Sequence, residues 1–160
     1  MKKKTPKRVQ QYAVSKKKPA KRVLKCSTKE WKNLSRASVL RKKTEEIYKE
    51  KYSGKSVVNL STGIKIQFDK HGASKTSRGG SIYAEKAALV TILDKICRQG
   101  YLYSLGKAKE TDIPKGVICF LNFKANVIVD DKYQTVLFSV RVMKSGTFHY
   151  HIDIPIKFVK

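Results

Sequence analysis

Arginine and histidine side chains gather near the end of the chain, in segments where polar and apolar residues alternate. The residues concerned are Arg141, His149 and His151. Histidine exchanges protons near neutral pH because its unperturbed pKa is about 6.5, while arginine stays charged and binds two phosphate oxygens at once. These residue types suit proton transfer beside a bound phosphate group.

The segment that must position these side chains covers residues 117–158 and predicts three consecutive β-strands. Apolar residues at every second position give each strand a dry, apolar face and a wet, polar face. A turn at residues 130–131 pairs Leu121 with Val140, so that apolar residues meet on the dry face. A slip of one residue in either hairpin would turn apolar side chains into water, and the register is therefore well specified.

The second predicted hairpin brings the polar residues together. A loop over residues 144–146 places Arg141 opposite His149 and Ser139 opposite His151. The wet face is therefore the candidate site, and Arg141, His149 and His151 are its candidate functional residues. Its predicted nucleic-acid contacts are Asn122, Lys124 and Ser139.

A polar, cationic and glycine-rich turn over residues 69–80 precedes a predicted helix. It contains no G-x-x-x-x-G-K-[ST] pattern and is therefore not a Walker A loop. Its backbone amides, together with Lys75 and Arg78, can bind phosphate ahead of the helix. Both side chains equally fit solvated surface charges.

The two C-terminal histidines have other interpretations. His149 and His151 alternate with apolar residues, as ordinary polar residues on a half-buried strand do. Their spacing on one face also fits two metal ligands, but only Asp153 aligns with them as a third. We therefore predict no metal site and no cofactor.

Two helical segments are expected before the strands. Ser27 or Thr28 caps a basic segment whose apolar residues have roughly helical spacing, as one long helix or as two short ones with a break near residues 35–38. Ser81 caps a helix that runs to about Arg98 and stops at Gly100. The apolar stripe of this second helix is expected to cover the dry face of the sheet.

The order of these elements predicts an α+β fold, with helices packed on one face of an antiparallel sheet that ends in a three-strand meander. A short hairpin or a bent strand is expected around residues 61–63. Residues 101–115 are expected to form a connector, either mobile or at the rim of the wet face.

The chain is strongly basic, with 36 Lys+Arg against 12 Asp+Glu and a formal net charge of +24. Residues 1–55 carry a net charge of +16 and residues 56–160 one of +8. This distribution predicts a disordered basic arm over residues 1–27, a basic helical segment over 28–52 and an α+β domain over 53–160. Such a field favours polyanions, and nucleic acid is the favoured partner, although a basic tail also aids solubility.

The cysteines and the hydropathy indicate the compartment. Cys26, Cys97 and Cys119 are widely spaced and form no CxxC pair, which fits a reducing environment. Cys97 and Cys119 occupy apolar positions and are expected in the core. No apolar stretch follows the basic start, and no run approaches the roughly 18 apolar residues of a membrane span. The chain is therefore expected to be soluble and cytoplasmic, without a membrane partner.

Several segments resemble a known group of domains. They are NLSTGIKIQFDKHGASKTSRGG, the Ala- and Leu-rich helix after it, FKANVIVDDKYQTVLFSVRV and FHYHIDI. Over about residues 56–154 the chain resembles the small domains of large polyvalent proteins in phages and conjugative elements. Those domains are grouped with the barnase–EndoU–colicin–RelE-like ribonuclease superfamily.

The resemblance implies helices on a curved antiparallel sheet whose opposite, open face cleaves RNA without metal. In such cleavage a base takes the 2′-OH proton, an acid protonates the leaving oxygen and a cation stabilises the phosphorane, so DNA, which lacks the 2′-OH, would stay intact. By position, it assigns His71, Lys75 and Thr76 of the polar turn to the site, together with Arg141, His149 and His151. The superfamily has no fixed triad, and some of its branches have lost catalysis. His71 also fits an ordinary surface turn.

Three functions fit these observations. The first is an RNA-binding protein with metal-independent endoribonuclease activity, such as a toxin-like effector of a mobile element. The second is a nucleic-acid-binding module of a phage or conjugative element without catalysis. The third is a protein–protein adaptor, such as an inhibitor, in which the charge only aids solubility. Whether the chain is an enzyme, and whether it has a protein inhibitor or partner, are left open by the residues.

Overall fold

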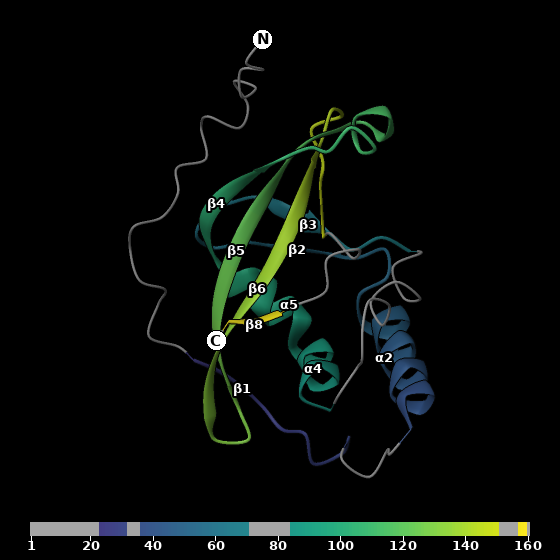
Figure 1. Ribbon diagram of the computed structural model, residues 1–160, viewed down its shortest axis with the longest axis vertical. Coiled ribbons are helices and arrows are strands. Elements are labelled where there is room, and N and C mark those ends of the chain that lie inside the picture. The colour runs from purple at the N-terminus through teal and green to yellow at the C-terminus, as the bar shows by residue number, and fades with distance from the viewer. Residues whose placement is uncertain (1–22, 32–35, 71–83, 151–156, 160) are drawn as a thin grey trace.

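The computed structural model describes residues 23–31, 36–70, 84–150 and 157–159, and these residues form an α+β fold (Figure 1). Its strands are β1 (Leu24–Cys26), β2 (Ser56–Val58), β3 (Lys65–Gln67), β4 (Tyr101–Lys107), β5 (Val117–Val129), β6 (Lys132–Met143), β7 (Phe148–Tyr150) and β8 (Lys157–Val159). They join in one sheet with the order β1-β5-β6-β7-β3-β2, while β4 also pairs with β5 and β8 with β6. The predicted fold class is confirmed.

The long hairpin of β5 and β6 forms the centre of the sheet. Its turn consists of Asp130 and Asp131, which have φ values of 48° and 67°. Aspartate tolerates this left-handed region, and such a turn matches the twist of the two strands that it joins. Leu121 pairs with Val140, so the predicted register is confirmed.

The third predicted strand is interrupted. In β7, Arg141 pairs with His149 as predicted. An unbroken strand would then place residue 154 beside Val136, but Val136 pairs with Phe158 of β8. Strands β7 and β8 therefore share the same edge of β6 in different registers, and the expected single strand over this stretch is wrong.

The sheet is mixed because two of its pairings are parallel. Strand β1 runs parallel to β5, and β3 runs parallel to β7. Strands β2 and β3 form the hairpin that was one of two alternatives for this stretch. Residues 101–107, which were predicted to belong to a connector, form β4. They pair with β5 through a register that shifts between Leu102 and Ser104, so apolar and polar residues do not alternate regularly along β4.

Strand β1 lies within the stretch predicted as a disordered arm. Its Leu24 is buried in the core, and its parallel partner is Val127. Just after it, the Thr28 amide donates to Asp130 Oδ1 at 3.0 Å, and the Thr28 hydroxyl donates to Asp130 Oδ2. These bonds hold the start of the described chain against the β5–β6 turn.

The helical elements are α2 (Ala37–Lys51), α4 (Ala84–Leu89), the 3₁₀ turn η1 (Val90–Ile92), α5 (Leu93–Gln99) and the 3₁₀ turn η2 (Ile113–Lys115). Helices α2, α4 and α5 lie along one side of the sheet, while the turn η2 lies at the end of the sheet where β4 leads into β5 (Figure 1). Helix α2 begins after Arg36, and residues 29–31 form a turn, so the expected capping role of Ser27 or Thr28 is wrong. Ser27 Oγ accepts from the Lys29 amide within this turn, and Thr28 bonds to Asp130. The second predicted helix ends at Gly100 as expected, but η1 divides it; Ser81 lies outside the described residues.

The core lies between the helices and the dry face. Phe123 and Phe138 stack with their ring centroids 5.0 Å apart, and both are buried. Gly100 allows this packing, because a Cβ there would lie 2.6 Å from the Phe138 ring. No helix in the described ranges is long and apolar enough to span a membrane.

The cysteine thiols give a test of this packing. Cys26, Cys97 and Cys119 are free, and burial raises the pKa of Cys26 and Cys119 from the ordinary 9.0 to about 11. Burial also raises the pKa of Cys97, and the nearby Asp130 adds to the effect at Cys26.

At pH 8, only roughly a thousandth of a thiol with a pKa of about 11 is ionised. Iodoacetamide should therefore label the native chain far more slowly than the chain unfolded in urea, as mass spectrometry would measure. Fast labelling of native Cys119 would contradict the packing.

Candidate functional site

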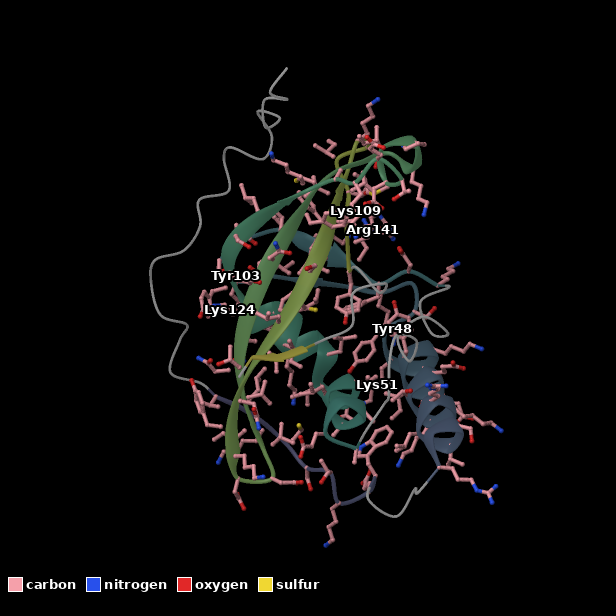
Figure 2. All side chains as sticks on the ribbon, viewed as in Figure 1. Tyr48, Lys51, Tyr103, Lys109, Lys124 and Arg141 are labelled. Atoms are coloured by element: carbon pink, nitrogen blue, oxygen red, sulfur yellow. The ribbon has the colours of Figure 1, made fainter. Side chains whose placement is uncertain are left out.

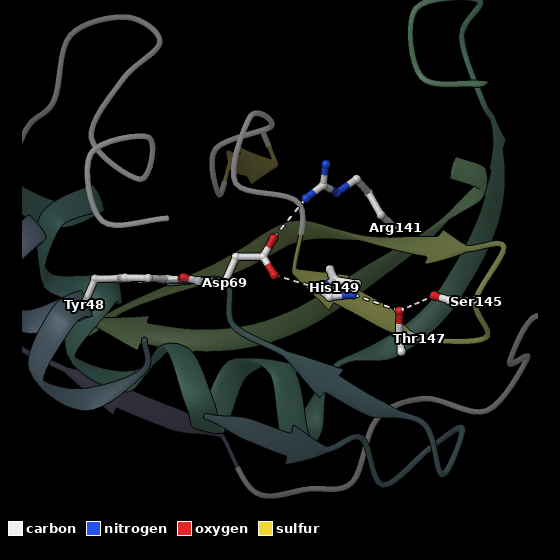
Figure 3. A network of polar contacts seen from close by, with 6 residues as sticks. All are labelled: Tyr48, Asp69, Arg141, Ser145, Thr147 and His149. Carbon is white, nitrogen blue, oxygen red and sulfur yellow. Dashed lines mark hydrogen bonds and ion pairs between the residues drawn. The ribbon is translucent and has the colours of Figure 1, made fainter. Parts of the chain in front are cut away.

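A single carboxylate, that of Asp69, joins two of the predicted site residues (Figure 3). Arg141 Nη2 donates to Asp69 Oδ2 at 3.0 Å, and His149 Nδ1 lies 2.6 Å from Asp69 Oδ1. The guanidinium and the imidazole are thus held side by side on one face of the sheet. Asp69 itself was not singled out from the sequence.

The strand register explains why these groups meet. Arg141 of β6 pairs with His149 of β7, which in turn pairs with Gln67 of β3. Paired residues on neighbouring strands point to the same face, so these three side chains form a row across the sheet. Asp69 follows β3 by two residues and therefore reaches the same face.

The backbone of Asp69 is fixed from the helical side. Tyr48 of α2 donates its hydroxyl to the Asp69 main-chain oxygen at 3.0 Å. The preceding Phe68 is buried and packs against Tyr150, with ring centroids 5.8 Å apart. Core packing thus holds the carboxylate at the place where it meets Arg141 and His149.

Hydroxyl groups continue the network beyond His149. Thr147 Oγ1 lies 2.9 Å from His149 Nε2, and Ser145 Oγ lies 2.9 Å from Thr147 Oγ1. An ionised carboxylate only accepts hydrogen bonds, so Nδ1 must donate to Asp69. In the neutral imidazole, Nε2 is then the acceptor and faces Thr147. A base oriented in this way by a third group is the usual arrangement of proton-transfer sites.

The network is partly shielded from solvent. The side chains of Arg141, His149 and Asp69 are 21%, 20% and 32% exposed. Arg141 Nε is buried and has no hydrogen-bond partner among the described residues. This N–H therefore loses contact with water without gaining a hydrogen bond, while the part of the guanidinium that binds Asp69 stays partly exposed.

The other described wet-face residues make separate contacts. Asn122 donates to Ser104 at 3.0 Å and accepts from Ser139 at 2.7 Å. The Lys124 ammonium lies 4.6 Å from the centre of the Tyr103 ring, and Figure 2 shows this pair away from Arg141. Asn122, Ser139 and Lys124 thus share the face of the Asp69 network without joining it.

Five predicted site residues cannot be placed relative to this network. His71, Lys75, Thr76, Arg78 and His151 all lie outside the described residues. Within the ranges that the structure does describe, no group of three or more His, Cys, Asp or Glu side chains is arranged to hold a metal ion.

The residues missed by sequence reasoning carry little local signal. Asp69 stands at the start of a polar turn, where aspartate is common for conformational reasons alone. Its meeting with His149 depends on the parallel pairing of β3 with β7, which are about 80 residues apart and joined by no local turn. Thr147 and Ser145 belong to the β6–β7 loop. The alternation of polar and apolar residues predicts strand faces only, so it does not predict where the hydroxyls of a loop point.

The comparison with protein families identifies the domain. Residues 36–150 match the family described as large polyvalent protein-associated domain 3, and this region is well over half of the chain. The chain therefore belongs to that family. All six residues of Figure 3 lie within the matched region. Neither a curated protein nor a solved structure matches the chain.

Removing the Asp69 carboxylate should destabilise the fold. In Asp69→Ala, the partly buried Arg141 loses its carboxylate and His149 loses its Nδ1 acceptor, so the free energy of unfolding should fall by about 1–3 kcal/mol. Urea denaturation would measure this loss.

An exposed ion pair provides the matched control. Glu30, whose side chain is 81% exposed, lies 3.9 Å from Lys43. Glu30→Gln should change the stability by less than about 0.5 kcal/mol. An equally small effect of Asp69→Ala would show that the Asp69 network does not support the fold.

Proposed function

We propose that this chain binds RNA and cleaves it without metal at the site formed by Asp69, Arg141 and His149. The observation that carries the proposal is the shared carboxylate, with Arg141 at 3.0 Å and His149 at 2.6 Å. It holds a proton-transfer group beside a permanent cation, which is the pairing that cleavage through the 2′-OH requires. The net charge of +24 supports a polyanionic substrate.

The proposed roles follow from the hydrogen bonds of each group. His149 is the general base: Asp69 orients its Nδ1, and Nε2 takes the 2′-OH proton through the Thr147 hydroxyl. Arg141 stabilises the phosphorane through the permanent charge of its partly exposed guanidinium. The acid that protonates the leaving oxygen is proposed to be His71 or His151.

Further contacts to the RNA are proposed from the sequence. Lys75, Thr76 and Arg78 of the polar turn would bind backbone phosphates. Asn122 and Lys124 of the wet face would bind more distant parts of the RNA, since they lie apart from the Asp69 network. Ser139 is buried and would act through its hydrogen bond to Asn122. Membership in a polyvalent-protein family supports the setting of a phage or conjugative element, in which a toxin-like role is proposed.

A second candidate function is nucleic-acid binding without catalysis. One observation favours it: Asp69 already binds both Arg141 and His149. These bonds would also stabilise the pairing of β3 with β7 in a protein without catalysis. The two functions differ in whether labelled RNA is cut, and the same basic chain would bind RNA in either case.

Single substitutions test the catalytic proposal. His149→Ala should reduce cleavage of a labelled RNA by about 10²–10⁴-fold because the positioned base is lost. Arg141→Ala should reduce it by about 10²–10³-fold because charge in the transition state is no longer stabilised. EDTA should have no effect, and DNA of the same sequence should stay intact.

The control for this experiment is Lys132→Gln, an exposed change at the far end of β6. It should cut RNA at the rate of the unchanged chain. If both His149→Ala and Arg141→Ala keep full activity while folded, the site is wrong, and if the unchanged chain cuts no RNA, the non-catalytic alternative stands.

Shortening the N-terminus tests the role of its charge. Residues 1–22 contain ten Lys and Arg and no acidic residue. Deleting them should weaken binding to a 20-nucleotide RNA by about tenfold or more at low salt and flatten the dependence of affinity on salt. The deletion should stop before β1, because Leu24 and Thr28 bind the rest of the fold. An unchanged low-salt affinity would show that these residues do not anchor RNA.

A further inference from the structure

Two adjoining cavities lie at the sheet edge next to the Asp69 network. The larger, of about 550 Å³, opens between the β2–β3 turn and the β6–β7 loop. The smaller, of about 390 Å³, lies between residues 54–56 and 67–70. Lys65 and Gln67 of β3 line both of them, so the two cavities form one divided cleft. Each volume is within the roughly 300–1,000 Å³ range of small-ligand sites.

The divided cleft is connected to the proposed catalytic groups on both sides. Thr147, which bonds to His149, lines the larger cavity. Asp69 lines the smaller one. Gln67, at the division, pairs directly with His149. A ligand that crosses from one cavity to the other would therefore pass beside the imidazole.

The smaller cavity has the chemistry of a phosphate site. Lys55, Lys65 and Lys70 line it, and all three residues are exposed. Its carboxylate, Asp69, is engaged by Arg141 and His149 and so leaves the field positive. Backbone hydrogen bonds from the Gly54 amide to the Phe68 oxygen and from the Phe68 amide to the Lys55 oxygen hold together the segments that carry Lys55 and Lys70.

The larger cavity has a different lining. Ile64, which is buried, and Phe148, which packs on the core, give it an apolar wall. Thr62 donates its hydroxyl to Asn59, and the amides of Gly63 and Gly146 bond within their turns, so these residues offer a polar edge oxygen acceptors. An apolar wall with a few polar groups suits a planar heterocycle such as a nucleobase.

We infer that the divided cleft binds single-stranded RNA, with an unpaired base in the larger cavity and the adjoining phosphate at the lysines of the smaller one. This inference rests on the proposed function, since it names the form of RNA that the site accepts. In a duplex, the base is stacked and paired and cannot enter a cavity.

Binding of short oligonucleotides to the full chain tests the cleft. The probe is a fluorescent single-stranded tetranucleotide with 2′-O-methyl groups, which cannot be cleaved through the 2′-OH. The double variant Lys65→Gln/Lys70→Gln should raise its Kd about tenfold, as measured by fluorescence anisotropy. The matched variant Lys42→Gln/Lys132→Gln removes the same charge from exposed positions elsewhere and should raise the Kd less than about twofold.

A second probe of equal charge tests the base cavity. A tetranucleotide with abasic sugars should bind the unchanged chain about tenfold more weakly, because stacking and base contacts are lost. The inference would be overturned if both double variants raised the Kd of the first probe equally. It would also be overturned if the unchanged chain bound the abasic probe as tightly as the first probe. These probes are not cut, so absence of ribonuclease activity would refute the proposed function without affecting this result.

Discussion

The carboxylate of Asp69 is the interaction on which the site depends. It joins β6 to the end of β3 through Arg141, and β7 to the same point through His149. Without it, a guanidinium and an imidazole would face each other on neighbouring strands with no anion between them. Two like charges so placed would repel each other whenever the histidine is protonated. The carboxylate thus makes the pairing favourable and also sets which imidazole nitrogen faces Thr147.

The core of the fold explains why the carboxylate can serve this role. Phe68 is buried among aromatic side chains, and Tyr48 binds the next main-chain oxygen. Polar groups on the wet face are therefore positioned by apolar packing on the dry face. Such support from rigid elements is what a proton-transfer site needs, because small misplacements are costly in rate. The same rigidity would serve a purely binding surface.

The sequence predicted the parts of this arrangement that depend on local alternation. The turn at Asp130 and the short β6–β7 loop fixed the register of both hairpins. The pairing of Arg141 with His149 could therefore be predicted by counting residues from the loop along each strand. It did not predict contacts made by parallel strands, because their partners are distant in the chain and no turn sets the register. Asp69 and β1 were missed for this reason. Family membership supports a polyvalent-protein context, while the RNA chemistry is a proposal.

The hydrogen bond between His149 and Asp69 can be observed directly by ¹⁵N NMR of the histidine ring at pH 8, where an ordinary histidine is neutral. The account predicts that the hydrogen of His149 resides on Nδ1, and that Asp69→Ala shifts it toward Nε2, the form favoured in unrestrained histidine. A folded chain in which His149 carries its hydrogen on Nε2, and keeps it there in Asp69→Ala, would contradict the central role of the carboxylate.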